Sequence, residues 1–272
     1  MSAATVDGRP HASAGRRIGW TFADVWLMTW RNLMYYWRNP YWIMIAVIQP
    51  IMFTLLFIFV FGPSIEDNLP GGLKYEDYAL PGIIVQTVVF SSLGSGINIA
   101  EDMQKGVMDR FRSLPTSRAT VLTARTLSDS VRNLLSLAIM AGVGFAVGYR
   151  FHGTFLDAVA AIGLCLAFGY AFSWIAATIG LLAKTTQTAE VAGFTWAFPV
   201  VFASSIFAPV DKFPGWLKAF AKVNPVTLTS DAVRALSTGF PLGNDAWLSL
   251  AWSVGLVAVF GTLAVLRFRR LT

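Results

Sequence analysis

Long apolar runs, separated by short polar segments, follow one another along almost the whole chain. A helix of about 20 apolar residues crosses the ~30 Å hydrocarbon core of a bilayer. Only 13% of the 272 residues are charged, whereas about a quarter are charged in a soluble domain. The sequence therefore predicts an all-α integral membrane protein with six transmembrane helices. They are expected at about residues 41–61, 78–100, 120–149, 155–183, 190–207 and 246–266.

The part of the chain before the first apolar run has two sections. Residues 1–19 are rich in Ser, Ala, Gly and Arg and have no apolar core, so we expect a mobile cytoplasmic N-terminus without a signal peptide. From Thr21 to Arg38, aromatic residues recur at helical spacing opposite polar ones. This pattern favours an interfacial amphipathic helix in the headgroup layer, although a soluble helix packed on a core shows it too. Residues 20–272 are expected to form one transmembrane domain.

A charged segment, Glu101–Arg118, separates the second and third apolar runs and reads EDMQKGVMDRFRSLPTSR. A charged side chain at the centre of a membrane helix costs roughly 2.5 to 3.5 kcal/mol on insertion scales. This segment is therefore expected to lie in water between two spans. No other part of the interior of the chain combines so many acidic and basic residues.

The distribution of Lys and Arg predicts the orientation. Six spans place both termini on one side, and assigning that side to the cytoplasm puts 15 of the 21 Lys and Arg residues inside. This excess follows the positive-inside rule. The charged segment and the 184–190 hairpin then face the cytoplasm, and the acidic 62–77 loop faces out. The net charge of +6 is explained by topology and does not require a nucleic-acid partner.

The segment 208–245 is rich in proline and contains two short amphipathic stretches, Gly215–Val223 and Thr227–Ser237. Stretches of 9 to 11 residues are too short to span a bilayer. We expect two outer re-entrant helices that dip into the interface between spans 5 and 6 and form an outer gate. The candidate gate residues are Pro209, Pro214, Trp216, Asn224, Pro225 and Arg234.

The sequence contains no pattern typical of a catalytic, metal or nucleotide site. Lys184 and Thr185 follow Gly180, but the second glycine of a phosphate-binding loop is missing. His11 and His152 have no ligand or nucleophile at suitable spacing, and the single Cys165 is expected to be a small buried hydrophobic residue. We therefore expect a transport body that is not an enzyme, has no cofactor of its own and has no internal energy source.

Two motifs resemble the membrane subunit of type-2 ATP-binding-cassette exporters, and within that family the daunorubicin-resistance type of permease. The first is the charged segment, with the motif residues Glu101, Gly106, Arg110, Pro115 and Ser117. The second runs from Phe207 to Thr227 and on to an arginine one helix later, with the motif residues Pro209, Phe213, Pro214, Trp216, Leu217, Asn224, Pro225 and Arg234. A weaker third match is Arg38–Pro40.

The resemblance implies a half-transporter in the bacterial plasma membrane. Two such permeases, identical or paralogous, would pack among membrane lipids with two cytoplasmic ATPase subunits, which use ATP and Mg. The part of the charged segment from Glu101 to Arg112 would be the cytoplasmic coupling helix between spans 2 and 3; the alternative is a solvated loop. The coupling residues would be Glu101, Asp102, Gly106, Met108, Asp109, Arg110, Phe111 and Arg112.

The polar residues of the second span are too numerous for a lipid-facing surface and are expected to point inward. With residues of the fifth span they would line a path for a lipophilic or amphipathic cargo such as a drug, an antibiotic or a glycolipid; plain helix packing is the alternative. The predicted lining is Gln86, Ser91, Ser95, Asn98, Thr195, Trp196 and Ser204. Other functions left open are export of a lipid-linked polysaccharide, ion-driven secondary transport, and a scaffold without transport.

Overall fold

The computed structural model describes residues 48, 50–66, 69, 72–106 and 118–270, apart from the side chains of 118–129 and 269–270. Within these residues every regular element is a helix, which confirms the all-α prediction for this part of the chain. The expected interfacial helix and the coupling residues from Met108 to Arg112 lie outside the described residues.

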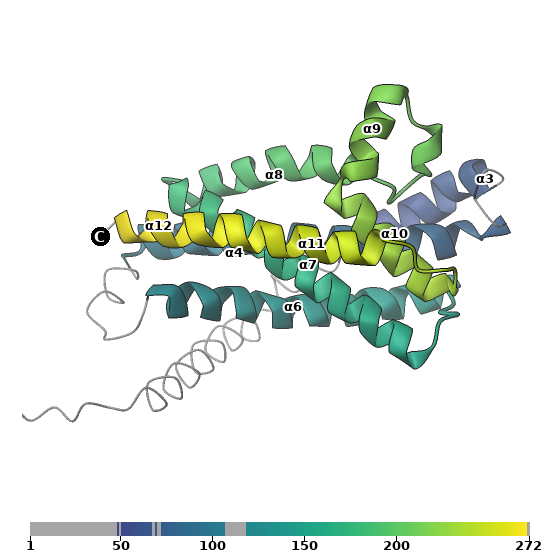
Figure 1. The fold of residues 1–272 in the computed structure, drawn as a ribbon, viewed down its shortest axis with the longest axis horizontal. Coiled ribbons are helices and arrows are strands. Elements are labelled where there is room, and N and C mark those ends of the chain that lie inside the picture. The colour runs from purple at the N-terminus through teal and green to yellow at the C-terminus, as the bar shows by residue number, and fades with distance from the viewer. Residues whose placement is uncertain (1–47, 49, 67–68, 70–71, 107–117, 271–272) are drawn as a thin grey trace, which may run out of the picture.

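The long helices run side by side as a bundle (Figure 1). They are α4 (Tyr75–Gln104), α6 (Arg118–Val147), α7 (Phe155–Leu182), α8 (Thr186–Phe202) and a last helix made of α11 (Asp245–Leu256), the π-helical turn η5 (Val257–Gly261) and α12 (Thr262–Arg270). The first described helix, Pro50–Ile65, ends with η1 (Phe57–Phe61) and α3 (Gly62–Ile65). The short helices η4 (Val210–Lys212), α9 (Gly215–Val223) and α10 (Pro225–Thr238) gather at the end of the bundle opposite the C-terminus.

Local sequence signals set the helix ends. Thr154 and Asp157 form a capping box at the start of α7: the Thr154 hydroxyl accepts from the Asp157 amide, and the Asp157 carboxylate accepts from the Thr154 amide at 2.7 Å. The hydroxyl of Thr185 caps α8 by accepting from the amide of Thr188 at 3.1 Å. Helix α4 ends in a turn at Gly106, whose φ of 63° favours glycine.

Helix α4 is the centre of the bundle and contacts α6, α7, α8 and α10. In its most apolar stretch 67% of the residues are buried, against 17% in the last helix. The fully buried side chains of the core include Leu80, Ile83 and Val88 of α4 and Phe168 of α7. The last helix therefore presents most of its surface outward, where lipid or another chain would cover it.

Helices α4 and α7 touch through their backbones. A Cβ atom added at Gly96 would overlap the carbonyl oxygen of Ala176, and one added at Gly180 would overlap the carbonyl oxygen of Gly96. About two turns before Ala176 on α7, the carbonyl oxygen of Gly169 accepts from the hydroxyl of Ser92 of α4 at 3.0 Å. Small residues allow the close approach that drives helix association in membranes.

Four of the described helices are long and apolar enough to cross a membrane: Tyr75–Gln104, Ser130–Val147, Phe155–Leu182 and Asp245–Phe268. They coincide with the second, third, fourth and sixth expected spans. The helices Pro50–Ile65 and Thr186–Phe202 occupy the positions of the first and fifth spans but are shorter than 18 residues in the described part of the chain.

Three of the differences between the helix bounds and the expected span limits affect the predicted site residues or the expected hairpin. The polar hairpin expected at 184–190 is only a short turn, because the Thr185 cap starts α8 at Thr186. The fifth helix, expected to reach residue 207, ends at Phe202, so that Ser204 lies beyond it. The second helix does not end at residue 100, because Glu101–Gln104 form its last turn.

Candidate functional site

An irregular segment, residues 203–208, follows α8, and most of its residues are buried; we call it the α8–η4 segment. Ser204, Ser205 and Ile206 are each no more than 2% exposed. The segment lies directly on α4, because a Cβ atom at Gly82 would stand 2.8 Å from the Cα atom of Ile206. Its backbone polar groups are therefore hidden from water and need partners within the protein.

Two tyrosines at the start of α4 supply part of these partners. The hydroxyl of Tyr75 donates to the carbonyl oxygen of Phe207 at 3.1 Å, and the hydroxyl of Tyr78 donates to the carbonyl oxygen of Ser205 at 3.0 Å. Both tyrosines are at most 3% exposed. The segment is thereby tied to a helix more than 120 residues earlier in the chain.

Arg234 of α10 joins all three parts of this site. Its guanidinium donates to the carbonyl oxygens of Tyr78 and Ser205, each at 2.9 Å, and is paired with the carboxylate of Asp231. The guanidinium carbon also lies 3.8 Å from the centre of the Tyr78 ring, in cation–π geometry. Arg234 as a whole is 8% exposed, and a charge this well buried requires such contacts.

Asp231 is the second anchor on α10. Its carboxylate accepts from the hydroxyl of Ser205 at 2.7 Å as well as from Arg234. The hydroxyl of Thr227, one turn earlier on α10, accepts from the amide of Ser205 at 3.2 Å. We call Tyr75, Tyr78, Ser205, Asp231 and Arg234 the arginine clamp; it connects the start of α4, the α8–η4 segment and α10.

Asn224 ties the junction of α9 and α10 to the end of α8. Its side-chain amide donates to the carbonyl oxygens of Val200 at 2.7 Å and Ala203 at 3.0 Å. Its side-chain oxygen accepts from the amide of Val226 at 2.9 Å and caps α10. One 2% exposed residue thus satisfies the last carbonyls of one helix and the first amide of another.

Helix α9 is attached more loosely. Lys218 of α9 pairs with Asp211 of η4 at 2.6 Å, and Asp211 is largely exposed. The hydrogen bond and positive charge of Lys218 hold the pKa of the Asp211 carboxyl below its ordinary value. Trp216, on the same helix, is 76% exposed. Surface ion pairs contribute little to stability, so the pair of Lys218 and Asp211 fixes α9 only weakly to η4.

The structure separates the six predicted gate residues into two groups. Asn224 and Arg234 are buried and bonded as described, and Pro225 occupies the first turn of α10. The remaining three lie apart from them, with Pro209 before η4, Pro214 before α9 and Trp216 exposed. Sequence reasoning missed Tyr75, Tyr78, Ser205 and Asp231; only the three-residue spacing of Asp231 and Arg234 on one helix could have indicated a pair.

At the other end of the bundle, the described coupling residues lie at the end of α4. Glu101 and Asp102 are in its last turn, and Glu101 pairs with Lys105. The side-chain amide of Gln104 is 3.5 Å from the carbonyl oxygen of Lys184, in the turn between α7 and α8. The end of α4 at Glu101–Gln104 and the turn at Lys184 therefore lie at the same end of the bundle, opposite the arginine clamp.

The predicted lining residues do not share one surface. Gln86 and Ser95 are buried, Ser91 and Asn98 are partly buried, and the backbone oxygen of Ser91 accepts from Arg132 of α6. This burial agrees with the expectation that the polar residues of the second span point inward. On α8, Thr195 is exposed and bonds to its own helix, whereas Trp196 packs on Phe172 with ring centres 5.5 Å apart. Ser204 is buried in the α8–η4 segment.

Two of these residues hold buried polar atoms without a partner among the described residues: the side-chain oxygen of Gln86 and the indole nitrogen of Trp196. Buried polar atoms are nearly always bonded, and leaving one unpaired costs about 1–3 kcal/mol. Both atoms belong to helices that contact each other, α4 and α8. Within the predicted lining, these two atoms could therefore form a hydrogen bond with a ligand.

Comparison with known proteins places the chain among transport proteins. The profile described as "ABC-2 type transporter" matches residues 23–237. The chain is 33% identical over 240 residues to the daunorubicin resistance ABC transporter permease protein DrrB1 of Streptomyces coeruleorubidus, covering 88% of this chain and 84% of that protein. It is 25% identical to the probable doxorubicin resistance ABC transporter permease protein DrrC of Mycobacterium tuberculosis, covering 90% and 88%. A putative transport permease, ycf38 of Cyanophora paradoxa, is 24% identical and is covered to 71%.

Proposed function

Because the chain belongs to the ABC-2 type transporter family, we propose that it is the membrane-spanning permease subunit of an ATP-driven exporter that moves a lipophilic or amphipathic compound out of the cell. ATP and Mg are used by separate ATPase subunits. The observation that carries this function is the match over residues 23–237, together with a relative that is named a drug-resistance permease. The resemblance inferred from the sequence motifs is thereby confirmed at the level of the family.

In this proposal two permeases, identical or paralogous, assemble with two ATPase subunits in the plasma membrane of a bacterium. Each permease crosses the membrane six times, with the helices Pro50–Ile65 and Thr186–Phe202 as the first and fifth spans. Both termini and the charged segment are cytoplasmic. The exposed large hydrophobic residues on the outside of the bundle support contact with membrane lipids or with the second permease.

Helix α4 is the proposed link between ATPase and outer gate. It has 30 residues and is therefore about 45 Å long. One end carries Glu101 and Asp102, the other carries Tyr75 and Tyr78. A displacement of the charged segment by the ATPase is transmitted along this helix to Arg234 and the α8–η4 segment. ATP then shifts the permease between two states by favouring one position of α4 over the other.

The test is ATPase-dependent efflux from vesicles containing the permease and its ATPase. Reversing the charges in the segment (Asp109→Arg with Arg110→Asp) should reduce efflux and permease-stimulated ATPase activity by roughly 30-fold or more, the effect of losing an interfacial hot spot. The matched control is Asp211→Arg at the opposite end, which should leave both activities near wild type.

Three results would contradict the proposal. Efflux that continues with a hydrolysis-deficient ATPase would indicate an ion-driven secondary transporter. Efflux that is unchanged by the charge reversal would remove the coupling role of the segment. If the complex forms but no transport depends on the permease, the protein is a membrane scaffold without transport.

A further inference from the structure

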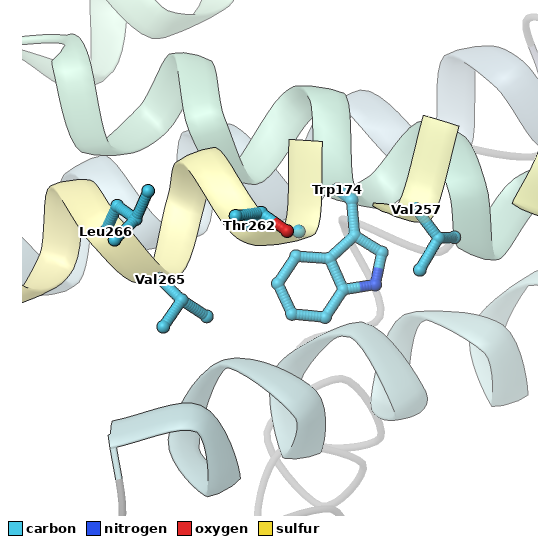
Figure 2. A pocket seen from close by; sticks show the side chains of 6 residues that line it. Trp174, Val257, Thr262, Val265 and Leu266 are labelled. Atoms are coloured by element: carbon cyan, nitrogen blue, oxygen red, sulfur yellow. The ribbon is translucent and has the colours of Figure 1, made fainter. Parts of the chain in front are cut away.

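An open groove of about 440 Å³ lies between α7 and the last helix. Trp174 of α7 forms one wall, and Val257, Gly261, Thr262, Val265 and Leu266 form the other. Figure 2 shows the Trp174 indole projecting beside the last helix, with its nitrogen on the side of Val257. The volume falls within the range of sites that hold small molecules. None of the predicted lining or gate residues belongs to this groove.

The local backbone makes room for the groove. The last helix widens into the π-helical turn Val257–Gly261 at this level, a feature that is frequent at functional sites. Gly261 presents no side chain to the Trp174 ring, from which an added Cβ atom would be 3.7 Å away. The hydroxyl of Thr178 donates to the carbonyl oxygens of Trp174 and of Phe260, at 2.9 and 3.1 Å, and so holds the widened turn against α7.

The polar atoms of the groove specify what it can bind. Among the described residues no charged side chain lines it, and the hydroxyl of Thr262 already donates to the carbonyl oxygen of Ala258 at 2.6 Å. Trp174 is only 5% exposed, and its indole N–H has no acceptor among the described residues. The groove therefore offers apolar walls and one unused hydrogen-bond donor, which suits a neutral ligand with an acceptor and disfavours an ion.

The depth of Trp174 within the membrane distinguishes between two kinds of apolar ligand, the acyl chain of a lipid and a compound that carries an oxygen acceptor. Trp174 is eight residues from the end of α7 at Leu182, which places it about 12 Å into the helix. The acyl chain of a membrane lipid has only methylene groups at that depth and would leave the indole N–H unpaired. A molecule with a carbonyl or ether oxygen inside an apolar frame would satisfy it.

We propose that this groove binds a neutral, apolar compound carrying an embedded hydrogen-bond acceptor, and that it is where the exported compound first docks from the bilayer. This inference rests on the proposed export function. The compound lies along Val257, Val265 and Leu266, and its acceptor oxygen takes the N–H of Trp174. The site is reached laterally from the membrane, because the last helix is the least buried of the four long apolar helices.

The test compares two probes that differ by one oxygen: 9-fluorenone, a flat aromatic ketone, and fluorene, the corresponding hydrocarbon. Binding is measured by equilibrium dialysis against the full chain in phosphatidylcholine nanodiscs, with empty nanodiscs subtracted. Fluorenone should bind about tenfold more tightly than fluorene, the value of one buried hydrogen bond. Trp174→Phe, which keeps a ring but removes the N–H, should abolish the difference between the probes.

Two controls locate the binding in the groove. Gly261→Leu fills it and should weaken both probes at least tenfold, whereas Gly255→Leu on the same helix, where an added side chain meets open space, should weaken neither. Trp247→Phe, which changes a 73% exposed indole on α11, should leave the preference for fluorenone intact. Size-exclusion profiles of all variants confirm that they remain folded.

Equal binding of the two probes to the wild type, or a preference that survives Trp174→Phe, would overturn the proposal. So would Gly261→Leu binding as well as wild type, because the probes would then sit elsewhere. Loss of fluorenone binding as phosphatidylglycerol is added to the nanodiscs would identify a lipid site instead. The assay needs no ATPase, so its failure is independent of the efflux test of the proposed function.

Discussion

Replacing Arg234 by alanine tests the arginine clamp most directly. The substitution removes three bonds at once, to the carbonyl oxygens of Tyr78 and Ser205 and to the carboxylate of Asp231. Hydrogen bonds to a charged group are worth about 1.5–3 kcal/mol each. The side chain of Asp231 is 33% exposed, so that in the variant water can solvate its carboxylate and offset part of the lost interaction. Both carbonyl oxygens stay buried and lose the donor, so we expect a loss of about 3–5 kcal/mol, as for a broken buried ion pair.

The expected loss is large enough to measure by thermal unfolding of the purified permease in detergent. For a chain of this size 1 kcal/mol corresponds to about 2–4 °C, which gives a decrease in the midpoint of roughly 6–20 °C. Arg234→Lys should lose less, about 2 kcal/mol, because an ammonium group keeps the charge but cannot reach three acceptors in the planar arrangement of a guanidinium.

The matched control is Arg150→Ala. Arg150 also donates to backbone carbonyls, those of Phe145 and Tyr149, but it is exposed and its partners lie within five residues. Its removal should cost less than about 1 kcal/mol. If Arg234→Ala lowers the midpoint no more than Arg150→Ala, the clamp does not hold the three parts together, and the proposed transmission through α4 loses its outer anchor.

Asn224→Ala should lower the stability by about 2–3 kcal/mol in the same assay. Asn224→Asp keeps the cap of α10 but loses the amide donor, so it should lower the stability by about half as much. Equal losses of stability in the two variants would contradict the hydrogen bonds described for Asn224. Gly96→Ala should cost roughly 1–3 kcal/mol, because its new methyl group meets a backbone oxygen of α7, while Gly163→Ala, with nothing within 4 Å, should be neutral or slightly stabilising. The lowered pKa of Asp211 means that its pairing with Lys218 stabilises the fold above the ordinary carboxyl range and is lost only as pH falls through the lowered value. The small difference in thermal midpoint between wild type and Asp211→Asn should therefore vanish only under strongly acidic conditions.

Helices set by local signals were predictable from the sequence. The bounds of α9 agree with the prediction, and the bounds of α7 differ from it by one residue. In these regions prolines, a capping box and apolar length all indicate the same limits. Hydropathy failed where a helix continues beyond its apolar part: Glu101–Gln104 prolong α4 because Glu, Met and Gln are good helix formers in water.

The arginine clamp could not be predicted from local patterns. Arg234 meets Tyr78 across 156 positions of sequence, and no periodicity relates residues so far apart. The motif resemblance identified Arg234 and Asn224 but gave no indication of the partner carbonyls. The groove at Trp174 was missed for a similar reason: its walls come from two helices whose apolar residues look like ordinary lipid-facing positions, and the π-helical turn has no clear sequence signature.

The contact between Gly96 and Gly180 limits how this protein can change shape. At this point of contact a backbone oxygen of each helix occupies the place of a missing side chain on the other, so no side chain lies between α4 and α7 there that could repack gradually during sliding. A small sliding of one helix along the other would break this backbone contact. The next position at which the two helices could pack in a comparable way is a full turn away, about 5.4 Å. The pair therefore moves as one rigid unit, and a path would open where this unit shifts relative to α8 and the last helix, which contact it.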